Sequence, residues 1–302
     1  MEEANVKLLS PKIDVVFQAL FGEIGSEEIT KSFLEAILKQ KITEIDLGKN
    51  PILRRTKVKD KLGILDVIAE INNKETCNIE MQVGKKDSII QRILFYWAKI
   101  YSRNIQISEK YNKLKRTIMI LIADFEIPTL KELGYLTKWK IIEEENRTVV
   151  LTEYLEIDII ELPKIYREKG KNNDELLKWL YFLEKPESKE VKYYMEKNEG
   201  IKKAKEKLET ISDDIIMQRL ADWREDAERD EAEMKEIAWN EGLEEGRKAG
   251  IEKGIKEGIK EGIKEGIKEE KANIAKKMKE QNMDIELIVN ITGLKKEEIE
   301  KL

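Results

Sequence analysis

The amino-acid sequence predicts an α/β fold, in which a mixed β-sheet flanked by helices is followed by a long helical C-terminal extension. Three observations lead to this prediction. Apolar β-branched runs alternate with segments of helical periodicity along residues 1–165. Charged residues make up 39% of the chain, a share that is typical of long solvated helices. Glycine recurs at every fourth position from Gly242 to Gly266, among residues that otherwise favour helix.

The N-terminal part of the chain is predicted to contain two amphipathic helices. Pro11 marks the entry of the first helix, and residues 27–41 have the periodicity of the second. Apolar residues recur at helical spacing in both segments, so each helix can bury one face. They are Val15, Val16, Ala19 and Leu20 in the first helix, and Ile29, Phe33, Ala36 and Ile37 in the second.

The first half of the sheet is predicted from three segments. Residues 42–48 have the composition of a short strand. Two β-branched runs follow, over residues 62–71 and 76–83. Because the intervening Asn-Asn-Lys at residues 72–74 is typical of a turn, we expect the two runs to form a hairpin.

The second half of the sheet is predicted to follow a long helix over residues 87–108. Residues 116–125 are nearly all apolar, as expected of a strand that is buried on both faces. Further candidate strands are residues 139–145, 147–154 and 155–162. Because these elements do not follow a βαβ repeat, the sequence predicts a mixed sheet.

We predict four segments along the chain. The core covers residues 1–165, and a helical region covers 166–240. A helix containing the glycine repeat covers 241–282, and a small helical unit covers 283–302. In the last unit, two short helices are expected to be separated at Gly293, which would cap the first of them.

Composition excludes several classes of chemistry. The chain has no histidine, so a Ser-His-Asp triad, a Cys-His dyad and a histidine-ligated zinc or iron site are impossible. Cys77 is the single cysteine, which excludes an internal disulfide and a cysteine-rich zinc site. A metal would therefore need oxygen ligands, as Mg²⁺, Mn²⁺ and Ca²⁺ do. No glycine-rich phosphate loop is present, so no nucleotide cofactor is expected.

The sequence also bears on location and charge. No apolar run reaches the roughly 18–20 residues that span a bilayer, and the N-terminus lacks the apolar stretch of a signal peptide. We therefore expect a cytoplasmic protein without membrane segments. The net charge is −5, but Lys and Arg outnumber Asp and Glu in residues 1–125. This distribution permits contact with DNA in the first part of the chain.

The predicted hairpin carries three polar residues that form a candidate site. Asp66 lies within an apolar run, where a carboxylate is costly unless it is paired or bound to a metal. Glu80 and Gln82 are two residues apart on the next strand, so both project from one face. Two interpretations are open at this point. Asp66 and Glu80 either converge on a hard metal ion or lie on a solvated sheet face near Lys or Arg.

The spacing of Asp66 and Glu80-x-Gln82 resembles the signature of PD-(D/E)xK nucleases. More narrowly, the chain resembles the recombination-promoting nuclease / putative transposase family of bacteria, along most of its length. The matching stretches are Pro11-Lys12-x-Asp14-x-x-Phe17-x-x-Leu20-Phe21-Gly22, Asp66-Val67, Ile79-Glu80-Met81-Gln82, Arg92-x-x-x-Tyr96-x-x-x-x-Tyr101, Glu161-Leu162-Pro163-Lys164 and Trp179–Leu183. The order and spacing of these stretches make the resemblance specific, and it implies a restriction-endonuclease-like core.

The resemblance implies metal-dependent hydrolysis of DNA phosphodiester bonds with low sequence specificity, linked to recombination or transposition. Asp66 and Glu80 would hold Mg²⁺, or Mn²⁺ or Ca²⁺, and Asp14 would complete the metal site. The alternative for Asp14 is an exposed carboxylate at a helix start. Gln82 stands where many such nucleases have Lys, and its amide can orient water but cannot act as a base.

Substrate contacts are also implied by the resemblance. Gln91 and Arg92 open the helix after the Glu80 strand, and Arg92 would contact phosphate or support the carboxylates. Lys57 and Lys59 belong to a basic run that leads into the Asp66 strand. This run would contact the DNA backbone, or it is an ordinary solvated loop.

The glycine repeat suggests a homodimer through the C-terminal helix. A lone helix with seven glycines is poor, whereas a glycine column allows a partner to approach closely. The alternative is a simple-sequence repeat that forms a solvated helix. Two alternatives to a DNA nuclease also stay open: a non-catalytic DNA- or protein-binding scaffold on a decayed nuclease fold, with Gln82 as the sign of decay, and RNA as the substrate.

Overall fold

The structure of the protein is a computed structural model. It describes residues 7–48, 50, 67–85, 88–106, 108–168 and 174–302. The chain divides into two compact units, Met1–Arg229 and Asp230–Leu302, and each is described by itself. Within the described ranges, none of the helices combines the length and the apolar character that crossing a bilayer requires.

A six-stranded mixed sheet forms the centre of the first unit. Its strand order is β1-β2-β3-β4-β6-β5. Strands β3, β4 and β6 run parallel, whereas β1–β2, β2–β3 and β5–β6 pair antiparallel. The strands are β1 (Ile45–Asp46), β2 (Val67–Ile71), β3 (Glu75–Gln82), β4 (Arg116–Ala123), β5 (Leu136–Ile142) and β6 (Val150–Glu161). The predicted α/β fold with a mixed sheet is confirmed.

The β2–β3 hairpin has the expected turn. Asn72 and Asn73 both have positive φ, 52° and 56°, which is the conformation of a type I′ turn. Asparagine tolerates this left-handed region better than most residues do. The turn fixes a register in which Val67 pairs with Ile79. Residues 62–66 of the predicted strand lie outside the described residues.

The β5–β6 hairpin differs from the prediction. The segments 147–154 and 155–162, predicted as separate strands, form one strand, β6, because no turn residue interrupts them. The predicted strand 139–145 is shifted to β5. It ends before Glu143, whose carboxylate accepts the backbone N–H of Asn146 in the turn.

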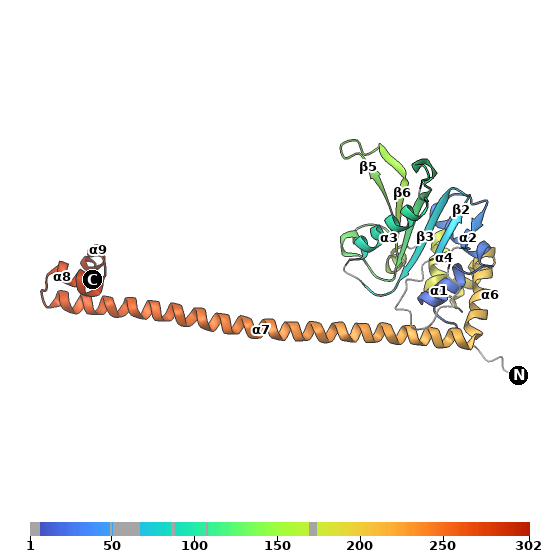
Figure 1. Cartoon of the computed structure of the whole chain (residues 1–302). Coiled ribbons are helices and arrows are strands. Elements are labelled where there is room, and N and C mark those ends of the chain that lie inside the picture. Colours follow the sequence, from blue (N-terminus) through green and yellow to red (C-terminus); the bar gives the residue numbers. More distant parts are fainter. Residues whose placement is uncertain (1–6, 49, 51–66, 86–87, 107, 169–173) are drawn as a thin grey trace. The chain divides into compact units, whose positions relative to one another are not determined.

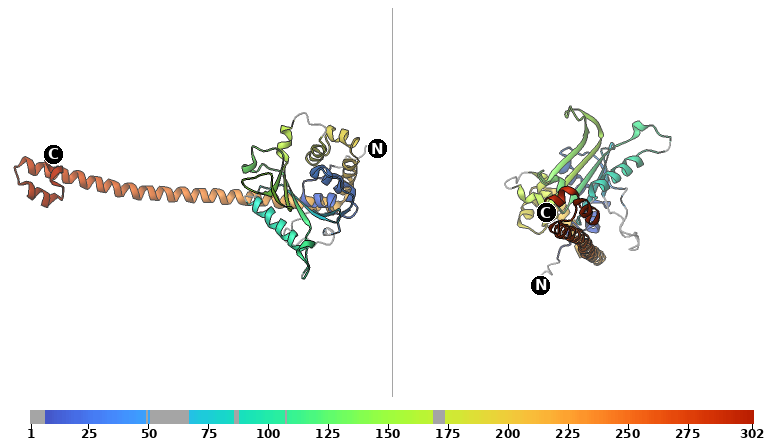
Figure 2. Two further views of the ribbon diagram at one scale, coloured as in Figure 1. Left: turned by 90° about the horizontal axis from the view of Figure 1, so that it is seen from above. Right: turned by 90° about the vertical axis from the view of Figure 1, so that its left-hand side faces the viewer.

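Helices cover both faces of the sheet (Figures 1 and 2). One face packs against α1 (Asp14–Phe21), α2 (Glu27–Leu38), α4 (Glu175–Glu184) and α6 (Glu199–Asp213). The other face packs against α3 (Ile89–Arg103). Helix α5 (Lys189–Met195) lies beside α4 and α6. Among the described residues, the 3₁₀ turns are η2 (Tyr111–Lys113), η3 (Pro128–Leu130) and η4 (Leu162–Arg167).

An aromatic cluster joins the first helices of the chain to α4. The ring centroids of Phe21 and Phe33 are 5.0 Å apart, and that of Trp179 is 5.2 Å from Phe33. All three side chains are completely buried. Burying such rings stabilises a fold by more than their area alone, through tilted ring contacts. The amphipathic helices that the sequence predicts therefore meet in one core with a helix that begins over 140 residues later.

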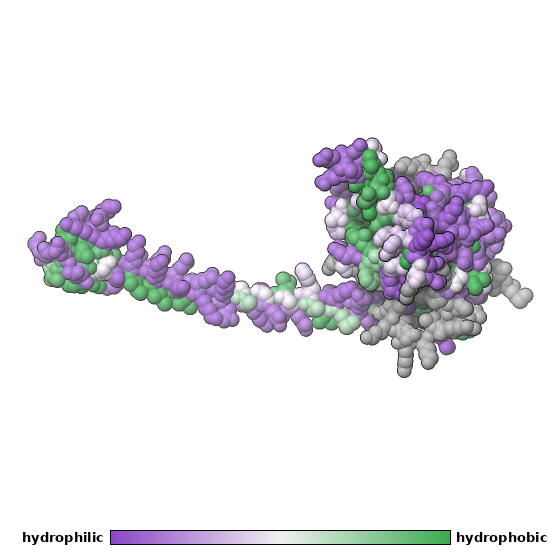
Figure 3. Space-filling model, turned by 45° about the horizontal axis from the view of Figure 1, so that its top comes forward, coloured by the Kyte–Doolittle hydropathy of each residue, from purple (hydrophilic) through white to green (hydrophobic). Residues whose placement is uncertain are grey.

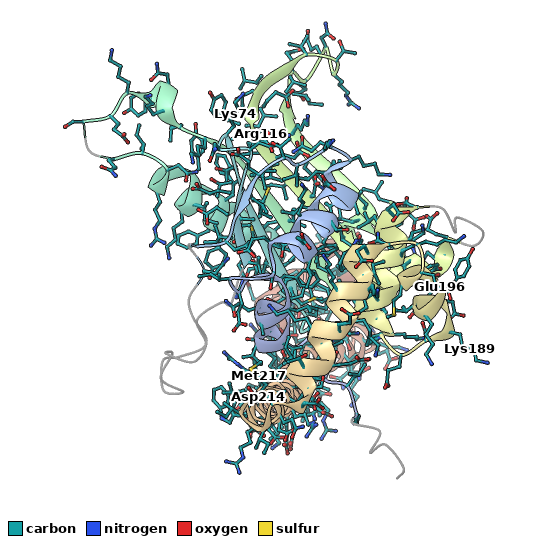
Figure 4. All side chains as sticks on the ribbon, turned by 90° about the vertical axis from the view of Figure 1, so that its right-hand side faces the viewer. Lys74, Arg116, Lys189, Glu196, Asp214 and Met217 are labelled. Carbon is teal, nitrogen blue, oxygen red and sulfur yellow. The ribbon has the colours of Figure 1, made fainter. Side chains whose placement is uncertain are left out.

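The helix α7 (Ile215–Glu280) begins after a corner at Asp214 and continues into the second unit. Asp214 accepts the backbone N–H of Ile216 at 2.8 Å and so caps the helix start. Figure 4 shows Asp214 and Met217 at this corner. The glycine repeat is helical, as expected.

In the second unit, α8 (Ile285–Thr292) and α9 (Lys296–Glu300) fold back on the last turns of α7 around a small apolar cluster. Gly293 ends α8 with a φ of 68°, so its predicted role as a helix cap is confirmed. The ammonium group of Lys279 donates to the carbonyls of Ile299 and Glu300 at 3.2 and 3.0 Å. These bonds satisfy free carbonyls at the end of α9.

Candidate active site

The candidate site lies at one end of the sheet. The parallel strands β3, β4 and β6 end at Gln82, Ala123 and Glu161, so their carboxyl ends share one edge. Figure 4 shows Lys74 and Arg116 together at the opposite end. Carboxyl ends of parallel strands are where α/β sheets commonly carry their ligands.

Glu80 is the most deeply buried of the predicted site residues that the structure describes. It is 1% exposed, and it pairs in register with Leu121 of β4, on the face that α3 covers. The Nε of Arg92, on α3, donates to its Oε1 at 3.0 Å. A buried carboxylate is tolerated only with such a partner.

Arg92 is itself held in place. Its guanidinium lies over the ring of Tyr96, one helical turn later, at 5.4 Å from the ring centroid. A cation over an aromatic face is stabilised by the ring quadrupole. Arg92 therefore supports Glu80 directly, while the neighbouring Gln91 is exposed on α3.

Gln82 is the last residue of β3 and is half-buried. Its carbonyl accepts the backbone N–H of Asp124 at 2.9 Å. Because side chains alternate along a strand, Gln82 projects to the same face as Glu80. The structure therefore places Glu80, Gln82 and Arg92 on one face of the sheet.

Asp14 lies at the first turn of α1, on a helix that packs against the other face of the sheet. Its Oδ1 lies 3.4 Å from the Nε of Arg224, in the part of α7 that belongs to the first unit. It also accepts the backbone N–H of Val15 at 2.7 Å. Burial raises the pKa of Asp14 above its usual value, although Arg224 and the Val15 N–H act in the opposite direction. The contacts of Asp14 are thus those of a helix-start carboxylate with an arginine partner.

The remaining predicted residues, Asp66, Lys57 and Lys59, lie outside the described residues. Asp66 directly precedes Val67, whose partner across the hairpin is Ile79, the residue before Glu80. In the part of the chain that the structure describes, no three acidic or cysteine side chains lie together in a way that could hold a metal ion.

Lys12, which was not among the predicted site residues, connects three elements near the carboxyl ends of the parallel strands. The Nζ of Lys12 lies 2.8 Å from Asp124, just after β4, and 3.0 Å from Glu184, at the end of α4. Burial lowers the pKa of Lys12, but the bonds to the two carboxylates outweigh it and raise the pKa overall. Tyr166 donates to the other oxygen of Glu184 at 3.1 Å. The sequence signal was slight, since Lys12 appeared only within the Pro11-Lys12 match.

A shallow groove of about 120 Å³ joins these residues to the end of β3. Lys12 and Arg224 line it, together with Val83, which follows Gln82. The lining also contains the carboxylates of Glu225 and Glu228. Two cations and two acids therefore face a small space beside the carboxyl end of β3.

The matching stretch at residues 161–164 has a structural role. Glu161 and Lys164 form an ion pair that is 0% and 1% exposed. Lys164 also donates to the carbonyl of Leu130, and Glu161 accepts the N–H of Ile127 at 2.7 Å. These bonds attach the segment after β4 to the end of β6, so this pair holds the fold together.

Comparison with known proteins places these features in a family. The family described as PD-(D/E)XK nuclease family transposase matches residues 11–238. This range includes β3 with Glu80, α3 with Arg92, and Lys12. No match was found among curated proteins or among solved structures. The chain belongs to the PD-(D/E)XK nuclease family transposases.

Proposed function

We propose that the protein is a metal-dependent endonuclease that hydrolyses DNA phosphodiester bonds with low sequence specificity, in recombination or transposition. The observation that supports this most strongly is the buried carboxylate of Glu80, supported by Arg92 near the carboxyl end of β3. Burying a carboxylate costs free energy, and the ion pair with Arg92 offsets this cost while keeping Glu80 close to the carboxyl end of β3. The family match adds the expectation of nuclease chemistry.

The donor set around Glu80 fits a hard divalent cation. Carboxylate and amide oxygens from Glu80 and Gln82 project from one face, and Mg²⁺ prefers such ligands. We propose that Asp66, next to Val67 on the adjacent strand, supplies the second carboxylate. When bound, Mg²⁺ or Mn²⁺ supplies positive charge at the scissile phosphate and lowers the pKa of the attacking water.

The other residues of the proposed site would orient the attacking water, support Glu80 and contact phosphate. The carbonyl oxygen of the Gln82 amide would accept a hydrogen bond from the attacking water and orient it. Arg92 keeps Glu80 in one orientation. The phosphate groups of the DNA would be contacted by Gln91, on the exposed side of α3, and by Lys57 and Lys59. Asp14 would join the metal only by releasing Arg224, so its proposed role is that of an outer acid.

The test compares two glutamates of β3 that each pair with an arginine. Glu80→Gln should abolish Mg²⁺-dependent nicking of supercoiled plasmid, with a loss of at least about 100-fold. Glu75→Gln is the matched control, because Glu75 pairs with Arg116 at 2.6 Å at the opposite end of the strand. It should retain nicking. Equal nicking by wild type and Glu80→Gln, or nicking that persists in EDTA, would refute the assignment.

A non-catalytic scaffold that binds DNA or protein is the second candidate, and Gln82 favours it because an amide cannot replace a lysine charge. Binding of DNA without turnover, equal in Mg²⁺ and in EDTA, would support the scaffold. Offering a single-stranded RNA and a plasmid to the same preparation decides between the two nucleic acids as substrate.

We also propose that the protein is a homodimer through the glycine-repeat helix, within residues 241–282. Five isoleucines in this segment are 53–58% exposed on α7: Ile251, Ile255, Ile259, Ile263 and Ile267. Burying such a column in a second copy would remove apolar surface from water, which stabilises association. Two nuclease units in one particle could cut both strands of DNA.

A further inference from the structure

The repeated unit Gly-Ile-Lys-Glu places a different residue type on each side of α7. Four residues advance about 400° on a helix, so each type forms a column that drifts by about 40° per repeat. Figure 3 shows hydrophobic residues along one edge of this helix, beside hydrophilic ones. The isoleucine column is therefore a face that the described part of the chain leaves exposed.

The two flanks of the isoleucine face are not equivalent. From Ile255 to Ile267, the residue before each isoleucine is a glycine and the residue after it is a lysine, and they lie about 100° to either side. Ile251 differs, because Glu252 follows it. The glutamates lie on the back of the helix, next to the glycine column. Around each glycine from Gly242 to Gly266, no atom other than those of the adjacent residues and the nearby helix backbone lies within 4 Å of where a Cβ would be.

This asymmetry distinguishes the two ways in which identical helices can pair through the isoleucine face. In an antiparallel pair, the lysine flank of one helix faces the lysine flank of the other, so the lysine columns would lie against each other and repel. In a parallel pair each flank faces the opposite flank of the partner. The lysines of one helix then cross the glycines of the other, and no like charges meet.

The charges that such a pair would use are available. Within the described residues, Lys260 and Lys264 form no ion pair in their own chain, and neither do Glu261 and Glu265. The glycine column of the partner has no side chains. The aliphatic part of a lysine can therefore pass over a partner glycine and bring its ammonium group to the partner glutamate next to that glycine. The glycines thus provide space for a cross-chain Lys–Glu pair.

We propose that two copies of the protein pair through α7 in parallel and in register, with each lysine column lying across the partner's glycine column. This refines the homodimer proposed above and is independent of the nuclease chemistry. The four-residue repeat exceeds 3.6 residues per turn, so the two helices would wrap with right-handed sense. The occupant of the isoleucine face is a second copy of this chain.

Cysteine cross-linking of the full chain tests the orientation. Ile251→Cys, Ile259→Cys and Ile267→Cys are each oxidised with copper phenanthroline and run on a non-reducing gel. Parallel pairing predicts that every variant cross-links to itself. Glu257→Cys, on the back of the helix, is the control and should stay uncross-linked. The native Cys77 is buried, so the wild type should give no dimer band.

Two other patterns would overturn the proposal. Antiparallel pairing would cross-link Ile259→Cys alone, and would join Ile251→Cys to Ile267→Cys only when the two are mixed. A monomeric mass with no cross-link in any variant would exclude pairing itself. Both results are read without DNA cleavage, so they are independent of whether the nuclease assignment holds.

A triple substitution of Gly254, Gly258 and Gly262 to Gln gives a second readout. Gln favours helix more than glycine does, so a solitary helix should gain helical content. In the parallel pair the new side chains block the path of the partner's lysines. We therefore expect the mass in solution to fall to that of a monomer while helicity is kept. An unchanged dimer mass would contradict the lysine-over-glycine arrangement.

Discussion

The two ends of the central sheet both bury carboxylates, but they balance them differently. At the amino ends of the parallel strands, Glu156 and Asp158 alternate with Arg116 and Lys138 in a continuous network of ion pairs. At the carboxyl ends, the buried Glu80 forms an ion pair with Arg92 on α3. A network that is balanced within the fold is sufficient for stability, whereas the proposed convergence of Asp66 with Glu80 would suit a cation from outside.

The largest expected effect on stability concerns the buried pair of Glu161 and Lys164, which has no proposed role in chemistry. Lys164→Met should leave a buried carboxylate without its cation and lower the free energy of unfolding by about 3–5 kcal/mol. Urea unfolding at pH 7 measures this. Lys203→Met is the control, because Lys203 pairs with the exposed Glu28, and it should leave the midpoint unchanged.

The amino-end network should make the stability of the protein depend on pH. Burial raises the pKa of Asp158 to about 6, although Lys138 acts against it. Since the unfolded chain releases this proton near pH 4 and the folded chain near pH 6, stability should fall as pH rises across that interval. The total fall is roughly 3 kcal/mol.

Asp158→Asn removes the titrating group and should flatten this slope. The measurement is urea unfolding at half-unit steps from pH 4 to 7, on wild type and variant. Asp158 is 0% exposed, so the effect should resist salt. An identical slope in both proteins would show that another group carries the pH dependence.

The carboxyl end should show the opposite relation between stability and activity. Glu80→Gln replaces a buried charge with a neutral group of the same shape, so we expect a change of at most about 1 kcal/mol in unfolding free energy. Nicking should nevertheless be lost. If the variant instead loses several kcal/mol, Glu80 belongs with Glu161 among the structural acids, and the contrast between the two ends disappears.

The last prediction concerns the turn that sets the register of β2 against β3, where we expect a modest change in stability and none in nicking. Asn73→Ala should cost about 1–2 kcal/mol, because alanine adopts positive φ less readily than asparagine does. Asn73→Gly should restore the stability, since glycine has no such penalty. Thermal melting of the three proteins is sufficient, and nicking should be retained in all of them.

Local pattern was sufficient to predict most of the helices, the β2–β3 hairpin and the shared face of Glu80 and Gln82, but it divided β6 into two strands. The alternation along residues 76–83 predicted that Glu80 and Gln82 share a face, and the Asn-Asn turn predicted the hairpin. Helix boundaries were close as well, because α2 and α3 carry apolar residues at helical spacing. These properties depend on neighbours within a few residues.

Contacts across long sequence separations could not be predicted. Lys12 meets Asp124 and Glu184, which are 112 and 172 residues away, and nothing local in the sequence identifies such partners. The pair of Glu161 and Lys164 was recognised as part of a motif, but only its burial shows that it is structural. The proposed roles of Asp66, Lys57 and Lys59 remain predictions.

The four-residue repeat has a consequence for how the gene can vary. Gain or loss of one Gly-Ile-Lys-Glu unit would lengthen or shorten α7 by about 6 Å and turn everything after it by about 40°. The order of the columns would be unchanged, because each residue type still follows its predecessor. Proteins with different numbers of units would then differ in the length of α7 while keeping the same order of residue columns. The repeat could therefore act as a spacer whose length changes under selection.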